Sequence, residues 1–311
     1  MARRERQLKP DGSVAVPDAS PSQLELLARI ADALERLSPA PMPLPDFRHC
    51  LAAQWRRVGQ TAWLEPVSTP HWVDADDLVA VDAQRELIDR NTRQFVRGRP
   101  ANNVLLTGAR GTGKSSLVKA MLARYGSQGL RLIEVDKAHL GDMATIARWV
   151  SDRPERFIVF CDDLSFDAGD ASYKALKAAL DGSIAAATPN LLIYATSNRR
   201  HLLPEYFHEN AETRYVGEEV HFGESVEEKI SLSERFGLWI SFHPFDQDAY
   251  LAAARRWVER LGGAVPTARQ AAVFEREALQ WALQRGSRSG RVAHQFARDW
   301  CGRHPHSRAR V

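Results

Sequence analysis

The chain has 311 residues, of which 44% are hydrophobic, enough for one large or two modest cores. Its 42 basic and 39 acidic residues nearly cancel, and a formal charge of +3 gives no support for a nucleic-acid-binding surface. Three widely separated cysteines lack metal-ligand spacing, and no apolar run approaches the roughly 18 residues needed to cross a bilayer. We therefore expect a cytoplasmic protein without a membrane segment.

Residues 1–74 are predicted to form a separate N-terminal element. Leucines and an isoleucine recur with helical spacing after the start signal at residues 20–22, which predicts an amphipathic helix ending near Leu37. Alternating prolines from Pro39 to Pro45 then predict an extended linker. A second helix is expected to carry Phe47, Leu51 and Trp55, followed by a short strand at 61–64. The tryptophans Trp55, Trp63 and Trp72 are packing residues or a partner-binding face.

Residues 75–243 alternate strand and helix patterns, which is typical of a parallel sheet covered on both faces. We expect five buried strands at 104–107, 131–135, 157–161, 191–196 and 237–242. Helices are expected near 114–124, 142–150, 171–181 and 225–234. Strand signals end after this region, and residues 244–311 are predicted to form a small helical domain with helices near 246–261, 267–284 and 289–301.

Residues 108–115 match the phosphate-binding pattern G-x-x-x-x-G-K-[ST] between a predicted strand and a predicted helix. Backbone N–H groups of such a loop surround phosphate oxygens, with the helix N-terminus facing the same anion. Lys114 would reach the β and γ phosphates, and the Ser115 hydroxyl would ligate Mg²⁺. A glycine-rich turn that merely caps a helix would not need lysine followed by serine. The predicted nucleotide-binding residues are Gly108, Ala109, Arg110, Gly111, Thr112, Gly113, Lys114, Ser115 and Ser116.

Asp162 and Asp163 directly follow the apolar strand at 157–161, at the sheet edge where ligands bind in open α/β proteins. Asp162 is suited to hold Mg²⁺ through water, and Asp163 to polarise an attacking water. The alternative is a helix cap. Asn198 follows the next predicted strand and either orients the lytic water or serves as a turn residue or cap.

Two arginines have both a catalytic and a structural interpretation. Arg235 ends a predicted helix before Gly237, where it either favours the helix dipole or inserts into the nucleotide of a neighbouring subunit. Arg291 lies in the first turn of the last helix, where a positive charge is unfavourable unless an anion such as a γ-phosphate is near. Arg288 is the second choice for this role, and either arginine could pair with a surface carboxylate. His294 is expected to be structural or exposed rather than catalytic.

Taken in chain order, these residues resemble the motifs of AAA+ ATPases. The two Walker motifs, sensor 1, arginine finger and sensor 2 correspond in order to residues 108–115, Asp162-Asp163, Asn198, Arg235 and Arg291. The final helices resemble the AAA+ lid, so the resemblance covers about residues 75–302. More narrowly, residues 100–106 (PANNVLL), 160–166 (FCDDLSF), 195–202 (ATSNRRHL) and 286–291 (GSRSGR) resemble the bacterial ATPases of the domain of unknown function 815 (DUF815) family.

This resemblance implies an α/β fold: a P-loop AAA+ core with a five-stranded parallel sheet, followed by an all-helical lid and preceded by a small N-terminal element. It implies ATP or ADP and Mg²⁺ as cofactors and a homo-oligomer, with a ring as one arrangement. Most AAA+ proteins have glutamate where Asp163 stands; the side chain here is one methylene shorter, so hydrolysis is expected to be slow.

Three functions remain open at this point. The first is Mg-dependent ATP hydrolysis that moves the lid and remodels an unidentified protein client. The second is a nucleotide-gated binding module or adaptor with little hydrolysis, which the short Asp163 side chain favours. The third is a P-loop kinase, which is weaker because the helical appendage and Arg235 have no necessary part in it.

Overall fold

The computed structural model describes residues 21–37, 43–166, 170–181, 188–199, 214–216, 219–221, 234–264 and 266–304. The chain divides into two compact units, one formed by residues 1–43 and 57–63 and the other by residues 44–56 and 64–311. The domain boundaries expected after residues 74 and 243 stay predictions. Within the ranges given above, no helix is both long and apolar enough to cross a membrane.

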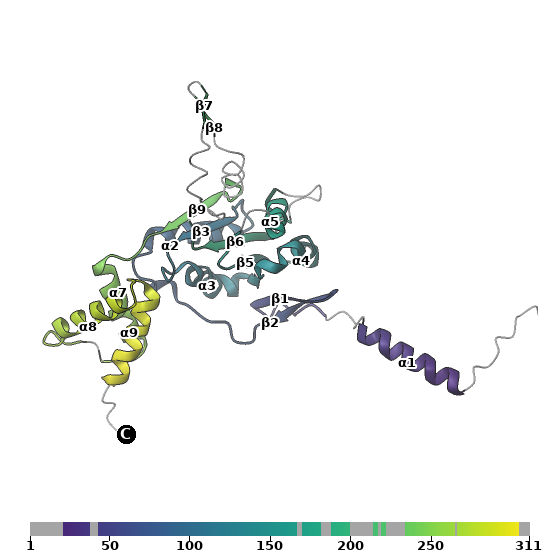
Figure 1. Ribbon diagram of the computed structural model, residues 1–311, viewed down its shortest axis with the longest axis horizontal. Coiled ribbons are helices and arrows are strands. Elements are labelled where there is room, and N and C mark those ends of the chain that lie inside the picture. The colour runs from purple at the N-terminus through teal and green to yellow at the C-terminus, as the bar shows by residue number, and fades with distance from the viewer. Residues whose placement is uncertain are drawn as a thin grey trace, which may run out of the picture. The chain divides into compact units, whose positions relative to one another are not determined.

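The first unit contains α1 (Pro21–Leu37), which confirms the predicted N-terminal helix (Figure 1). Its apolar residues recur every three or four positions and therefore share one helix face. Five of them have more than half of their side-chain surface exposed: Leu24, Leu26, Leu27, Ile30 and Leu34. Of the expected proline linker, residues 38–42 lie outside the described residues.

The main sheet has seven strands in the order β2-β1-β4-β5-β6-β3-β9. The pairs from β1 through β9 in this order are parallel. The α/β fold class predicted from the sequence is confirmed, but the sheet has seven strands in place of five. Of the two additional strands, β1 was not expected, whereas β2 confirms the short strand expected at 61–64. The strands are β1 (Ala52–Val58), β2 (Thr61–Pro66), β3 (Val104–Gly108), β4 (Leu130–Glu134), β5 (Arg156–Cys161), β6 (Leu191–Ser197) and β9 (Leu238–Phe242).

The prediction of a helix around Phe47, Leu51 and Trp55 is wrong, because residues 52–58 form strand β1. Residues that are four apart lie on one face of a helix, but an even spacing also places them on one face of a strand. In the ladder between β1 and β4, Ala52 pairs with Leu132. This pairing satisfies the backbone hydrogen-bonding groups of the segment and favours the strand over the helix. Trp55 is buried against Trp149 at 5.0 Å between ring centroids, so it is a packing residue.

The sequence predicts that all five strands are buried, and for β9 this prediction is wrong. β9 is the edge strand beyond β3. Trp239 on β9 is 36% exposed, whereas the central strands β3 and β5 are buried over most of their length. An edge strand has a neighbour on one side only, so fewer side chains cover it. A separate antiparallel pair, β7 (Arg214–Val216) and β8 (Glu219–His221), has no counterpart among the predicted elements.

Helices α3 (Lys114–Tyr125), α4 (Met143–Val150) and α5 (Ala171–Asp181) confirm three predicted helices. The fourth, near 225–234, lies outside the described residues apart from Glu234. Short 3-10 turns occur at η1 (Ala75–Asp77), η2 (Gly126–Gln128) and η3 (Lys137–Asp142).

Helix α2 (Asp82–Val96) was not predicted from the sequence. Its buried face includes polar Asn91 and Thr92, which interrupt the apolar helical pattern. Both side chains hydrogen-bond to the hydroxyl of the buried Tyr194 on β6, at 3.0 and 2.9 Å. The polar residues are therefore satisfied inside the core, where the sequence pattern alone would have placed them on the surface.

The chain ends in α7 (Gln247–Arg260), α8 (Ala271–Gln284) and α9 (Gly290–Arg303), which confirms the three predicted C-terminal helices (Figure 1). These helices, called the lid below, share a hydrophobic core that contains Tyr250, Phe274 and Phe296. Side-chain caps fix two of the starts: Asp246 accepts from the backbone N–H of Ala249, and Ser289 from that of Val292.

Candidate nucleotide-binding site

The loop of residues 108–113 joins β3 to α3 and has the backbone geometry that only glycine adopts readily. Gly108, Gly111 and Gly113 have φ values of 129°, 75° and 101°. A Cβ on Gly108 would also lie 2.0 Å from the carbonyl oxygen of Phe242 on β9. Gly113 precedes α3 without a side-chain cap, so the backbone N–H groups of the first helical turn are available to an anion.

Lys114 begins α3 and is 6% exposed. Its Nζ donates to the carbonyl oxygens of Gly108 at 2.7 Å and Ala109 at 2.8 Å, and to Asn198 Oδ1 at 3.0 Å. Burial lowers the pKa of this ammonium group, partly offset by the charges of Asp163 and Asp162. The Lys114 ammonium group is thus buried and bonded to uncharged carbonyl oxygens of the loop. Charged phosphate oxygens are stronger acceptors, so the loop is suited to bind a polyphosphate.

The ends of β5 and β6 place Asp162 and Thr196 beside the start of α3. Asp162 Oδ1 accepts from Ser115 Oγ and from Thr196 Oγ1, each at 2.6 Å. The same Thr196 oxygen accepts from the backbone N–H of Asp163 at 2.9 Å. The two predicted metal-binding residues, Ser115 and Asp162, are therefore in direct contact.

Asp163 has a φ of 53°, in the left-handed region that few non-glycine residues occupy and that aspartate tolerates better than most. Asn198 Nδ2 donates to Asp163 Oδ1 in a short contact. Because Asn198 Oδ1 also accepts from Lys114, one amide joins the lysine to the second carboxylate. The three predicted residues thus form a single polar chain along the ends of β3, β5 and β6.

The predicted Mg²⁺ would bind through oxygen ligands. Across the part of the chain that the structure describes, no three His, Cys, Asp or Glu side chains could hold a metal ion together. Mg²⁺ keeps several waters and is usually held by one or two protein oxygens together with substrate phosphates. Ser115 and Asp162 fit that sparse donor set.

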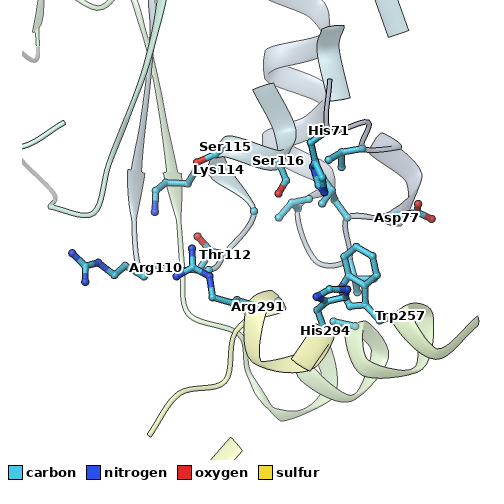
Figure 2. A pocket seen from close by; sticks show the side chains of 18 of the residues that line it. His71, Asp77, Arg110, Thr112, Lys114, Ser115, Ser116, Trp257, Arg291 and His294 are labelled. Carbon is cyan, nitrogen blue, oxygen red and sulfur yellow. The ribbon is translucent and has the colours of Figure 1, made fainter. Parts of the chain in front are cut away.

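A cavity of about 890 Å³ lies against these residues (Figure 2). Eleven of the residues predicted to bind or act on the nucleotide line it: Arg110, Gly111, Thr112, Gly113, Lys114, Ser115, Ser116, Asp162, Asp163, Asn198 and Arg291. Gly108 and Ala109 are not among the lining residues, and their carbonyl oxygens hold Lys114. Arg288 lines a different cavity, so the structure favours Arg291 of the two.

Arg235 is not among the residues lining this cavity. Its Nε donates to Asp181 at the end of α5 in a short contact, and its side chain is 25% exposed. The residue therefore stands apart from the predicted nucleotide-binding residues of its own chain. A role on a bound nucleotide would require a second copy of the protein.

The opposite side of the cavity consists of residues that sequence reasoning missed. In Figure 2, His71, Asp77, Trp257 and His294 lie across the cavity from Lys114. This base side, as it is called below, is mainly apolar: Trp72, Val73, Leu78, Val79, Val81, Phe245, Trp257 and Leu261 belong to it. The available signal was the pair of apolar segments at 72–73 and 78–81, on either side of an acidic stretch, just before the first core helix.

His294 packs edge-on against Trp257, with 4.5 Å between ring centroids. Burial, followed by the charges of Arg298 and His71, lowers the pKa of His294. The neutral imidazole is therefore favoured at the base side, and the structural role expected for His294 stays a prediction.

The phosphate-binding loop touches the lid directly. A Cβ on Gly111 would lie 2.9 Å from Ser289 Oγ and 3.1 Å from Arg291 Cβ, and a Cβ on Gly290 would lie 3.2 Å from the Gly111 carbonyl oxygen. Both glycines thus allow a close approach of loop and lid. Movement of the lid would change the position of Arg291 relative to the loop.

A family model described as "Protein of unknown function (DUF815)" matches residues 48–304. No functionally curated protein matches the chain. Similar solved structures include Thermotoga maritima RuvB, titled a Holliday junction branch migration motor, with 16% identity, a TM-score of 0.42, and coverage of 74% of this chain and 71% of that one. A single-residue variant of that protein has 14% identity, a TM-score of 0.43, and the same coverage of both chains. Similarity at this level carries no inference about activity.

Proposed function

Because the chain belongs to the DUF815 family, whose function is unknown, we propose a function from its cavity: the protein binds ATP with Mg²⁺ and hydrolyses it slowly. The observation that carries the proposal is the convergence of Lys114, Asp162, Asn198 and Arg291 on one cavity from four separate elements. A glycine-rich turn that only caps a helix gives no reason for this convergence.

Binding begins with the loop and the N-terminus of α3, whose backbone N–H groups donate hydrogen bonds to the phosphate oxygens. Lys114 exchanges its two carbonyl partners for β- and γ-phosphate oxygens, which are stronger acceptors because they are charged. Ser115 and Asp162 would hold Mg²⁺, which would supply neutralisation of the phosphate charge. The apolar base side, with Trp257 and Val79, receives the base of the nucleotide.

Hydrolysis depends on the polar chain at the strand ends. Asp163 accepts a proton from the attacking water, and Asn198 orients that water from the next strand. Arg291 faces the terminal phosphate from the lid, which would link the state of the nucleotide to the position of the lid. The short side chain of Asp163 holds the water less closely than a glutamate would, so we expect slow turnover.

Arg235 is proposed to act on the nucleotide of a neighbouring subunit in a homo-oligomer, for which a ring is one arrangement. Its place outside its own cavity supports this role, because an arginine supplied in trans must be directed at a neighbour. Stabilisation of the transition-state charge by such an arginine is worth roughly a thousandfold or more in turnover.

The biological output is proposed to be remodelling of a protein client by nucleotide-driven lid motion, in the cytoplasm. The direct contact between Gly111 and the start of α9 supports the coupling step. A pull-down with an Asp163→Asn variant, which should retain ATP, tests for the client: a protein captured with ATP and released with ADP supports remodelling.

The proposal is tested by measuring fluorescent ATP-analogue binding and phosphate release on the full chain, with and without Mg²⁺. We expect saturable binding and slow, Mg-dependent phosphate release. Absence of binding would contradict the proposal. Transfer of labelled phosphate to an acceptor other than water would instead favour a P-loop kinase.

A nucleotide-gated binding module is the second candidate. The observation that favours it is the state of Asp163, whose carboxylate is engaged by Asn198 and whose backbone occupies the left-handed region. A carboxylate held in this way is less free to polarise water. Phosphate release that does not differ between the wild-type protein and Asp163→Asn, together with ATP-dependent partner capture, would decide for this module.

A further inference from the structure

Asp77 is a carboxylate enclosed at the contact between the sheet-containing core and the lid. It ends η1, just before α2, and only 6% of its surface is exposed. Both of its oxygens are engaged by lid arginines: Oδ1 by Arg256 at 2.9 and 3.1 Å, and Oδ2 by Arg260 at 2.6 Å. A buried carboxylate with both oxygens paired to guanidinium groups of another part of the chain forms a specific link.

The two arginines lie one helical turn apart on α7, so they approach Asp77 from the same helix face. Trp257 lies between them in sequence and lines the cavity together with Asp77 (Figure 2). Arg260 also belongs to the cavity lining. A displacement of α7 away from Asp77 would therefore move Trp257 and widen the base side.

Leu78, the residue after Asp77, lies next to the phosphate-binding loop. Leu78 lines the cavity, and its Cδ2 lies 4.0 Å from where a Cβ on Gly113 would stand. The short segment around Asp77 thus contacts the lid on one side and the start of α3 on the other. A displacement of the lid would therefore shift this segment against the start of α3, and a displacement of α3 would shift it against the lid.

These ion pairs contribute little to stability, because the cost of burying the Asp77 carboxylate offsets much of its attraction to Arg256 and Arg260, whose side chains are 37% and 48% exposed. Their geometry is exacting, however, so the paired and separated states are distinct. The link around Asp77 has the properties of a two-state contact between core and lid.

We propose that Asp77, Arg256 and Arg260 form a clasp that holds the lid closed over the cavity and sets how long a nucleotide stays bound. The inference rests on the proposed function, because it requires a nucleotide in the cavity. The three residues are positioning residues: they act on the nucleotide through the placement of Trp257 and the base side. Opening of the clasp is the step that releases the nucleotide.

The experiment measures the dissociation rate of a fluorescent ATP analogue from the full chain by displacement with excess ATP. We expect Asp77→Asn to release the analogue about tenfold faster or more, and Arg260→Gln to do so by a smaller factor, because Arg256 still holds Asp77. Asp77→Glu keeps the charge and should restore much of the slow release.

Asp76→Asn is the matched control. Asp76 is the adjacent carboxylate on the same turn, but it is exposed and pairs with Arg85 of α2 instead of the lid. We expect its dissociation rate to stay within about twofold of the wild type. Thermal unfolding of each variant identifies those that do not fold, and Arg260→Gln keeps the test valid if Asp77→Asn fails to fold.

Wild-type binding with unchanged release from both folded Asp77→Asn and Arg260→Gln would overturn the clasp and leave the proposed function intact. If Asp76→Asn accelerates release of the analogue as much as Asp77→Asn does, the clasp is also overturned. Loss of any negative charge on this turn would then explain the faster release. A wild-type chain that does not bind the analogue contradicts the proposed function and the clasp together.

Discussion

The two sides of the cavity are built in different ways. The phosphate side uses polar residues from one continuous loop and from the ends of adjacent strands, joined by hydrogen bonds such as those from Lys114 and Ser115. The base side uses mainly apolar residues from the segment 71–81 and from two lid helices far along the chain. Apart from Arg291 of α9, the phosphate side is assembled by the core, whereas the base side is complete only when the lid is in place.

This difference separates two properties of the site. The polar groups of the phosphate side satisfy one another at the ends of the parallel strands, through hydrogen bonds within the core. The base side depends on the position of α7 and α9, and hence on contacts such as those of Asp77 with Arg256 and Arg260. We therefore expect variants on the phosphate side to change binding and chemistry, and variants on the base side to change affinity and residence time.

The largest effect is expected from Arg235→Ala, which removes a charge that neither side of the cavity provides. Nucleotide affinity should stay within about twofold of the wild type, while turnover falls roughly a thousandfold. Steady-state phosphate release at high protein concentration measures this. Normal turnover by dilute, strictly monomeric wild-type protein would show that no neighbouring subunit is needed and would exclude the role in trans.

Lys114→Ala is expected to weaken nucleotide binding about a hundredfold, because it removes the charged donor from the phosphate side. Equilibrium titration with a fluorescent ATP analogue measures the change. Lys119→Ala, on the same helix but outside the cavity, is the matched control and should bind normally. Equal losses in both variants would mean that α3 is damaged and that Lys114 has no special part.

Trp257→Ala is expected to weaken binding about tenfold, since one aromatic contact with a base contributes roughly 1–3 kcal/mol. The effect should appear mainly as faster dissociation, which distinguishes the base side from the phosphate side. Trp281→Ala provides the comparison, because Trp281 is a lid tryptophan that does not line the cavity. If both variants bind equally weakly, lid stability and not the base contact explains the loss.

The smallest effect is expected from pH at the base side. Burial lowers the pKa of His294 below its usual 6.5, so the unfolded chain binds a proton more readily than the folded one. Stability should therefore fall as pH decreases through 6.5 toward the lower pKa of the folded protein, and then level off. The partly exposed ring keeps the change below about 1 kcal/mol. In urea unfolding, the His294→Gln variant should not show this loss of stability at low pH. A variant with the pH dependence of the wild type would mean that another group causes the loss.

The phosphate side was predictable because its chemistry is local in sequence. The loop pattern, the carboxylates Asp162 and Asp163 after one strand, and Asn198 after the next all follow from residue type and from the rule that parallel strands end at one edge. Thr196 was missed as a site residue, although it is the polar side chain that binds both carboxylate residues. A hydroxyl at the end of an apolar strand was the signal for it.

The failures follow from contacts between distant segments. Helix α2 was missed because Asn91 and Thr92 are satisfied by Tyr194, about a hundred residues away in the chain. The strand β1 was read as a helix because its partner β4 lies far along the sequence. The clasp was invisible for the same reason, since nothing near Asp77 in the sequence indicates that arginines at 256 and 260 will surround it.

By itself, the sequence determined the α/β class, the phosphate-binding loop and the polar residues that follow the strands, because each depends on backbone preferences or chemistry within a few residues. The tertiary structure alone decided that residues 52–58 form strand β1 of the sheet, and it alone decided the base side and the meeting of Asp77 with the lid. These depend on which distant segments can bury their apolar faces and pair their charges together, and no local pattern encodes that choice.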